Sequence, residues 1–443
     1  MAGSDILRSS ASLFAAGLAL LFSMGGGTPR VQGQSLKETI RLALANDSAI
    51  SAAAQGAESS QLEADAAFRG ILPSLNIGSS YQYVSQTADV TLPSLPGKPA
   101  QTIALGQQNT VDLFAGVRWA PFTGFAQQAT VEMKRLQALL ARNNLDSTRV
   151  GVALKTVIAY RQAQAALLQI DILTSARDRA QLQIDHSAAL EKEGMAQKVD
   201  VLSLTIARLG YDQKLIAARA SLADALDRLK SLTDKEISVP PPPAANPEIV
   251  LPPLKEEQLD QIKALSIQRG ILVQSRRLAE SKLYPTLSLS AALHYGVPGV
   301  NPILNEWMLY GTAAAALSWS FNWGGDILAA RAANRNLSKL GSDELSARHL
   351  IELDYASAVR DWYAMQSEAK VIEASLDLAR TKMGIVKVQY EQGMASTTDF
   401  NDANLGMAQA ELQYRSQLLA LLFQANQIDA LSGEPIDQWS VTP

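Results

Sequence analysis

The chain has 443 residues, of which 47% are hydrophobic and 19% charged, a balance that excludes an intrinsically disordered protein. Its net charge of −4 provides no basic excess for neutralising phosphates and argues against a nucleic-acid partner. It contains no cysteine and only three histidines, which excludes disulfides, thiol nucleophiles, cysteine-ligated metals and a lipid on an N-terminal cysteine.

The N-terminal segment has the pattern of an export signal. Arg8 precedes an apolar run of about 10 residues, from Leu13 to Phe22, and the glycines at 25–27 end it. The run is too short to cross a bilayer as a helix, which needs about 20 residues. We expect residues 1–33 to be a cleaved signal peptide, and an uncleaved membrane anchor is the alternative.

The remaining sequence reads as two similar halves, residues 34–239 and 254–435, joined by a proline-rich linker at 240–253 and followed by a tail at 436–443. Short motifs recur in the same order in both halves: Leu72–Leu75 and Tyr284–Leu287, then Pro121–Gly124 and Asn322–Gly324, then Gly194–Ala196 and Gly393–Ala395. An ordered duplicate set indicates an internal structural repeat. The prolines make the linker extended and semi-rigid.

Four segments alternate apolar and polar residues with a period of two, which predicts strands at about 75–84, 111–121, 287–295 and 311–323. Apolar residues take the odd-numbered positions, and Phe114 is an exception on the even ones. Each run is long enough for a tilted strand to cross a bilayer. Aromatic residues suited to the membrane interfaces occur in these runs: Tyr81, Tyr83, Trp119, Tyr295, Trp319, Phe321 and Trp323. A half-buried antiparallel sheet of a water-soluble protein is the alternative.

Four strands cannot enclose a pore, because small membrane barrels start at about eight strands. If these strands cross a membrane, other copies of the chain must supply the remaining strands. Three chains would supply twelve.

Long intervals without proline predict unusually long helices. No proline occurs between residues 121 and 240 or between 302 and 435, and both intervals are rich in good helix formers. A helix of about 65 residues would be roughly 100 Å long. Its apolar stripe needs a partner helix, which predicts coiled-coil hairpins that reverse near Gly194 and Gly393.

The ordered set of motifs over about residues 35–435, which begins with Ser35-Leu36 and Ala43–Asn46, resembles the outer-membrane factor family of Gram-negative bacteria, the TolC-like efflux and secretion ducts. The resemblance implies an α+β membrane protein. Its long α-helical coiled-coil hairpins would form a periplasmic tunnel, and its four antiparallel strands per chain would contribute to a trimeric 12-stranded outer-membrane β-barrel.

The same resemblance implies a function and partners. The chain would be the outer-membrane exit duct of a tripartite efflux or type I secretion system. It would act as a homotrimer that conducts substrates passively from a periplasmic adaptor and an inner-membrane transporter to the outside. The segments at 85–109 and 297–309 are expected to be external loops, because they are rich in proline and glycine.

Candidate pore residues also follow from the resemblance. The second hairpin tip corresponds to the periplasmic mouth, where Asp399 and Asp402 match two aspartates that constrict the pore and bind cations. Tyr390 matches a gate tyrosine, whereas Ala395 stands where some members carry a basic residue. The alternatives are aspartates that only stabilise a helix start and a tyrosine that only packs.

Both hairpin tips resemble segments that contact the adaptor. Small residues there allow close approach of two backbones, and methionine adapts to an irregular surface. The alternative is a plain turn. The expected contact residues are Gly194, Met195, Ala196, Gly393, Met394 and Ala395.

The sequence offers little support for an enzyme. It contains no H-E-x-x-H, G-x-S-x-G or P-loop motif, and its three histidines lie in different segments. We therefore expect no catalytic residues, no metal site and no cofactor. The alternative to a duct is an exported coiled-coil scaffold that tethers the envelope without a pore.

Overall fold

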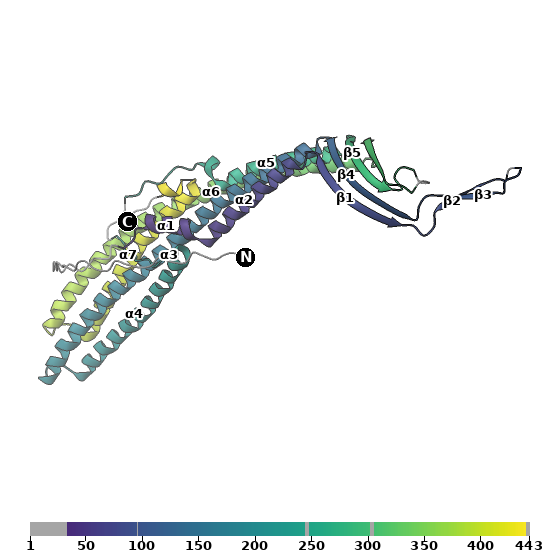
Figure 1. Cartoon of the computed structure of the whole chain (residues 1–443). Coiled ribbons are helices and arrows are strands. Elements are labelled where there is room, and N and C mark those ends of the chain that lie inside the picture. The colour runs from purple at the N-terminus through teal and green to yellow at the C-terminus, as the bar shows by residue number, and fades with distance from the viewer. Residues whose placement is uncertain (1–32, 95, 244–247, 302–304, 440–443) are drawn as a thin grey trace, which may run out of the picture.

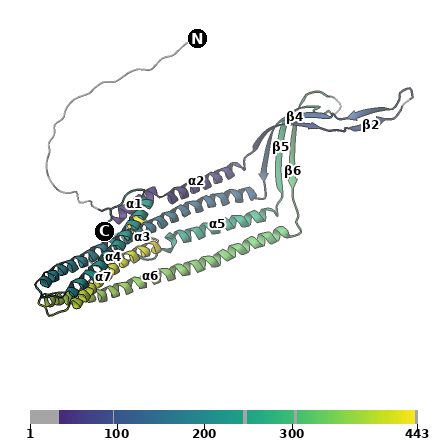
Figure 2. The same cartoon turned by 90° about the horizontal axis from the view of Figure 1, so that it is seen from below.

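The computed structural model describes residues 33–94, 96–243, 248–301 and 305–439. Nearly all of the predicted signal peptide lies outside this range. The described chain is elongated, with the hairpin tips at one end and a sheet at the other (Figures 1 and 2). Within the described residues, no helix combines the length and apolarity that crossing a membrane requires.

The described residues form seven α-helices whose lengths repeat between the two halves of the chain. The second, third and fourth helices have 22, 67 and 36 residues, and the fifth, sixth and seventh have the same three lengths. At 1.5 Å per residue the longest pair extend about 100 Å. The helices are α1 (Leu36–Asn46), α2 (Ser48–Arg69), α3 (Ala126–Lys192), α4 (Lys198–Thr233), α5 (Asp260–Ser281), α6 (Gly325–Glu391) and α7 (Thr397–Ser432).

Each long helix reverses at a glycine with positive φ. Gly194 follows α3 with φ 76°, and Gly393 follows α6 with φ 75°, a region that residues with a Cβ rarely adopt. In both tips the next amide donates to a carbonyl five residues earlier over 2.8 Å, from Met195 to Leu190 and from Met394 to Gln389. The predicted hairpin reversals are thereby observed.

Four antiparallel strands form one sheet in the order β1-β4-β5-β6. The predicted strands are all present, with two differences. A short hairpin occupies part of the segment 85–109 that was expected to be a loop, and the last strand lies earlier than predicted. The strands are β1 (Ser74–Tyr83), β2 (Ala88–Leu92), β3 (Gln101–Leu105), β4 (Asn109–Phe122), β5 (Thr286–Val297) and β6 (Met308–Ser318).

The early end of β6 follows from its pairing. Ser318 lies opposite Thr286, the first residue of β5, so the residues after Ser318 have no partner strand in the described chain. The alternating aromatics Trp319, Phe321 and Trp323 therefore lie beyond the strand in which the sequence placed them.

All four strands turn their odd-numbered residues to one face of the sheet. Ile77 lies opposite Ala115, Ala115 opposite Leu293, and Leu293 opposite Gly311. Directly opposite residues share a face, so the apolar parity of four separate segments forms one continuous surface. Ile77 is 78% exposed and Leu293 61%, so the described chain does not bury this face against its own helices.

The helical core lies between the hairpins. Helix α3 packs against α4 and α7, and nearer the sheet against α2 and α5. Tyr160 is fully buried at its centre, and its hydroxyl donates to the carbonyl oxygen of Gln34 over 2.9 Å. Alanine recurs along the buried side of α3, which lets neighbouring helices approach closely.

Candidate functional site

Asp399 caps its own helix. Ser396 precedes α7, and its hydroxyl accepts the amide hydrogen of Asp399 over 3.1 Å. In return the Asp399 carboxylate accepts from the Ser396 amide over 3.0 Å and from the Ser396 hydroxyl over 2.6 Å, which completes a capping box. These hydrogen bonds hold the pKa of Asp399 below its usual value, and the bond from the Ser396 hydroxyl has the largest effect. The carboxylate is exposed and ionised at neutral pH.

Asp402 lies one turn further along α7 and is also exposed. Residues three apart on a helix lie on the same face, so both carboxylates belong to one exposed surface near the hairpin tip. Both carboxylates carry negative charge at this end of the chain, and Lys382 is the basic side chain whose charge acts on Asp399.

Tyr390 joins the two hairpins through a chain of hydroxyl groups. Its hydroxyl lies 2.9 Å from Ser187 of α3 and 3.2 Å from Thr397 of α7, and Thr397 donates to Asp200 of α4 over 2.7 Å. An ionised carboxylate can only accept hydrogen bonds, so the direction of donation is fixed along the whole chain. Ser187 donates to Tyr390, Tyr390 donates to Thr397, and Thr397 donates to Asp200. One chain of hydrogen bonds therefore connects four helices.

Tyr390 also packs. Its ring lies 5.4 Å from that of Phe400, beside a buried cluster that includes Leu204 and Met383. The hydrogen bonds and the packing both fix the second hairpin against the first at the tip end.

The hairpin tips expose their methionines. Met195 is 66% exposed and Met394 69%. A Cβ added at Gly194 or Gly393 would meet no atom within 4 Å, so both turns face open space. The two tips lie at the same end of the molecule, as Figure 2 shows.

The aromatics predicted for the membrane interfaces gather near the two ends of the sheet. One group lies at the end of the sheet near the β2–β3 hairpin, and the other lies at the end next to the helices. The indole nitrogen of Trp119 in the second group donates to the carbonyl oxygen of Ile71 over 3.2 Å. The first group is Tyr81, Tyr83 and Tyr295, and the second is Trp119, Trp319, Phe321 and Trp323.

The opposite face of the sheet carries a row of rings that the sequence analysis did not find. Phe114, His294 and Tyr310 lie directly opposite one another on β4, β5 and β6, with ring centroids 6.0 and 5.0 Å apart. His294 Nδ1 lies 2.8 Å from a carboxylate oxygen of Asp112. The ring of Phe114 covers Gly78, where an added Cβ would come within 2.8 Å of it. In the sequence, the only sign of this row was Phe114, an apolar residue at an even-numbered position where polar residues were expected.

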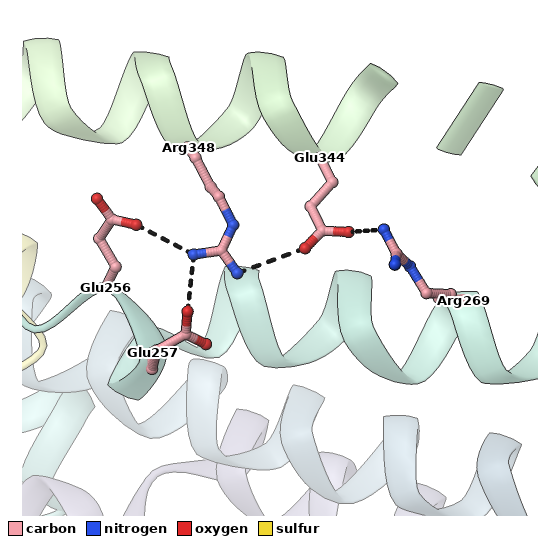
Figure 3. Close-up of polar contacts among 5 residues, drawn as sticks. All are labelled: Glu256, Glu257, Arg269, Glu344 and Arg348. Atoms are coloured by element: carbon pink, nitrogen blue, oxygen red, sulfur yellow. Dashed lines mark hydrogen bonds and ion pairs between the residues drawn. The ribbon is translucent and has the colours of Figure 1, made fainter. Parts of the chain in front are cut away.

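A charged cluster beside α5 is structural (Figure 3). Arg348 of α6 contacts Glu256 and Glu257 of the 3-10 helix at Glu256–Gln258 over 3.1 and 2.8 Å, and Glu344 over 3.4 Å. The second oxygen of Glu344 bonds to Arg269 of α5. Each carboxylate has a guanidinium partner, so the cluster ties α5, α6 and the linker end together.

The sequence and fold both match known proteins. Residues 39–234 match the family model described as outer membrane efflux protein, and the fold match extends over both halves of the chain. Residues 39–234 of this chain are therefore similar in sequence to the outer membrane efflux protein family. This match agrees with the predicted family and with the predicted outer-membrane location that extends into the periplasm.

Three solved structures show the same fold as this chain. The CmeC outer membrane channel of Campylobacter jejuni has 14% identity and a TM-score of 0.77, covering 93% of this chain and 87% of its own. The outer membrane protein VceC of Vibrio cholerae has 15% identity and a TM-score of 0.73, and the match covers 90% of this chain and 96% of VceC. The MtrE outer membrane channel of Neisseria gonorrhoeae has 15% identity and a TM-score of 0.71, and the match covers 90% of this chain and 88% of MtrE. A search of curated protein sequences gave no match. The CmeC and MtrE structures are described as outer membrane channels.

Proposed function

We propose that this chain is the outer-membrane exit duct of a tripartite efflux or type I secretion system. Substrates would pass through it passively, from a periplasmic adaptor and an inner-membrane transporter to the outside. The observation that carries the proposal is the exposed apolar face shared by four strands, which suits contact with lipid. The family match supports the same conclusion.

The unpaired edges of the sheet support a homotrimer. Strands β1 and β6 each have a partner on one side only within the described chain, and a sheet in lipid must satisfy both edges. Each edge would pair with the opposite edge of a neighbouring copy. Three copies would close a 12-stranded barrel.

The helices carry two apolar seams that support the same assembly. On α4 the exposed residues recur with coiled-coil spacing, and on α6 they recur every seven residues. Two different seams on one chain suit a head-to-tail ring of identical subunits. The seams are Val199, Leu202, Ile206 and Leu209 on α4, and Val371, Leu378 and Ile385 on α6.

Asp399 and Asp402 are proposed to form rings at the periplasmic mouth. Three copies of each carboxylate around one axis would concentrate negative potential, favour cations and oppose anions. The hydroxyl chain through Tyr390 would hold the second hairpin against the first and keep this mouth narrow. The exposed methionine tips would meet the adaptor.

Membrane fractionation and conductance test the function. The full chain should sediment with outer membranes after washing with high salt or carbonate, dissolve only with detergent, and form channels in planar bilayers. Release of intact protein without detergent would contradict the duct and favour the tether.

A further inference from the structure

A cavity of about 730 Å³ opens where the sheet meets the helices, between α2, α3 and α5. Both signs of charge line it. Helix α3 supplies Glu132 and Arg135, and α5 supplies Arg277 and Glu280.

The cavity adjoins the apolar face. Ile71 lines the cavity, and its carbonyl oxygen accepts the hydrogen bond from the indole of Trp119, which lies on the apolar face. Phe122 shares the apolar face with Leu287, because the register shifts between Trp119 and Phe122. The rings of Phe125 and Tyr284, which also line the cavity, extend this aromatic surface.

These rings meet edge to face, with centroids 5.5 Å apart from Phe122 to Phe125 and 6.0 Å apart from Phe125 to Tyr284. Phe125 adopts φ 71°, a costly conformation for a residue with a ring, and its side chain remains 55% exposed. Such a conformation persists only where the surrounding structure fixes it, and here it leaves an exposed ring beside the cavity.

Three of the four charges of the cavity are paired and one is not. Glu280 Oε1 lies 3.4 Å from Nε of Arg276, which leaves its second carboxylate oxygen without an ion pair within the described residues. Arg135 lies 3.5 Å from Glu132 and its guanidinium lies 5.7 Å from the centre of the Phe68 ring. Arg277 contacts only the amide oxygen of Gln274, at 3.4 Å, and forms no ion pair within the described residues. An exposed guanidinium that is held toward a cavity and lacks a carboxylate suits a phosphate oxygen.

We propose that this cavity binds the headgroup of a zwitterionic phospholipid from the leaflet next to the helices. The phosphate would bond to Arg277 and Arg135, and the primary ammonium to Glu132 and Glu280. The acyl chains would follow Phe125 and Tyr284 onto the apolar face. The proposal rests on the proposed function, since it needs a bilayer around the sheet. A free anion would leave the adjoining aromatic surface unused.

Native mass spectrometry of the full chain in detergent tests the site. Phosphatidylethanolamine should be retained in preference to phosphatidylcholine, because a quaternary ammonium cannot donate hydrogen bonds to Glu132 or Glu280. Arg277→Gln should lower retention of phosphatidylethanolamine about threefold to tenfold. Glu132→Gln with Glu280→Gln should lower it too, but leave phosphatidylglycerol retention unchanged. Arg335→Gln, an exposed change on α6 outside the cavity, is the matched control.

Equal retention of phosphatidylethanolamine and phosphatidylcholine by the unmodified chain would overturn the proposal without any variant. Unchanged retention in Arg277→Gln, or full displacement of the lipid by an equal concentration of inorganic phosphate, would overturn it as well. Channel formation by the same sample in planar bilayers is read separately. Channels without lipid preference would reject only the headgroup site, whereas a chain without channels would reject the duct.

Discussion

At the residue scale, Asp399 caps a helix, and a pore role is proposed for the same side chain. Its carboxylate accepts hydrogen bonds from Ser396 and so fixes the first turn of α7. The same contacts favour the ionised form, which keeps the charge that a cation-binding ring needs. A helix-start role and a pore role are therefore compatible.

The carboxylate pair can be tested by conductance. Asp399→Asn with Asp402→Asn should weaken channel block by divalent cations about tenfold, because the ring charge is lost while the side chains keep their shape. In the unmodified chain the lowered pKa of Asp399 keeps block steady from about pH 8 to about pH 5, and block should weaken only as pH falls through the carboxyl range. Asp343→Asn on α6 is the control. Unchanged block in the double variant would remove the constriction from this position.

Tyr390→Phe tests the hydroxyl chain. The variant keeps the ring packing against Phe400 and removes two hydrogen bonds, each worth about 1 kcal/mol. The open fraction of single channels should rise about fivefold or more. Tyr363→Phe, an exposed tyrosine on the same helix, should leave it unchanged. Equal open fractions in both variants would show that Tyr390 only packs.

Buried Tyr160 and Arg161 give opposite pH dependences. Burial raises the pKa of Tyr160 to about 12 and lowers the pKa of Arg161 to about 10. Folding therefore favours the neutral phenol, and that stability is lost as pH rises from about 10 toward 12. Burying the Arg161 cation costs stability, and this cost diminishes as pH rises through about 10.

Tyr160→Phe separates the two effects. It should cost about 1 kcal/mol near neutral pH by removing the hydrogen bond to Gln34. Between about pH 9 and pH 11 the variant should lose less stability than the unmodified chain, because only the latter carries the titrating phenol. Thermal unfolding at the two pH values measures the difference. A parallel loss in both proteins would contradict the buried phenol.

At the element scale, the sheet depends on a close contact between Gly78 of β1 and the ring of Phe114. Gly78→Ala would place a Cβ 2.8 Å from that ring and should destabilise the sheet by about 1–3 kcal/mol. Adding Phe114→Ala should recover part of the loss because the ring is gone. Gly56→Ala, where a Cβ meets nothing within 4 Å, is the control and should not destabilise. The difference in gel mobility between heated and unheated samples measures how much of the sheet is folded.

Periodicity predicted most of the elements because each carries its own signal. Strand parity, proline-free helices and tip glycines are local properties, and the pairing register places the predicted odd positions on one face. The β2–β3 hairpin was missed because prolines and Gly97 between its short strands resemble a loop. The end of β6 was missed because it depends on where β5 begins.

The candidate sites were predicted less completely. The predicted reversal at Gly393 placed Asp399 and Tyr390 near a tip, but their pore roles came only from the family resemblance. The hydroxyl chain to Asp200, the ring row beside Asp112 and the cavity near Arg277 join residues far apart in sequence. No local pattern marks contacts of this kind.

At the scale of the whole molecule, the apolar seams predict that assembly and stability are linked. Leu378→Lys on α6 should shift detergent-purified protein from trimer toward monomer, because a charge would enter the proposed seam. His349→Lys, an exposed polar position on the same helix, should leave the mass unchanged. Light scattering gives the mass. A stable trimer in the first variant would place the interface elsewhere.

Among the described residues, Met195 and Met394 are the two methionines with exposed side chains. Hypochlorite or peroxide oxidises accessible thioethers first and turns them into polar sulfoxides. The cysteine-free wall of the conduit would be spared, while both tips would lose their soft apolar character. If the tips contact an adaptor as proposed, oxidative stress would weaken that contact before damaging the rest of the chain, and methionine sulfoxide reductases could reverse the lesion.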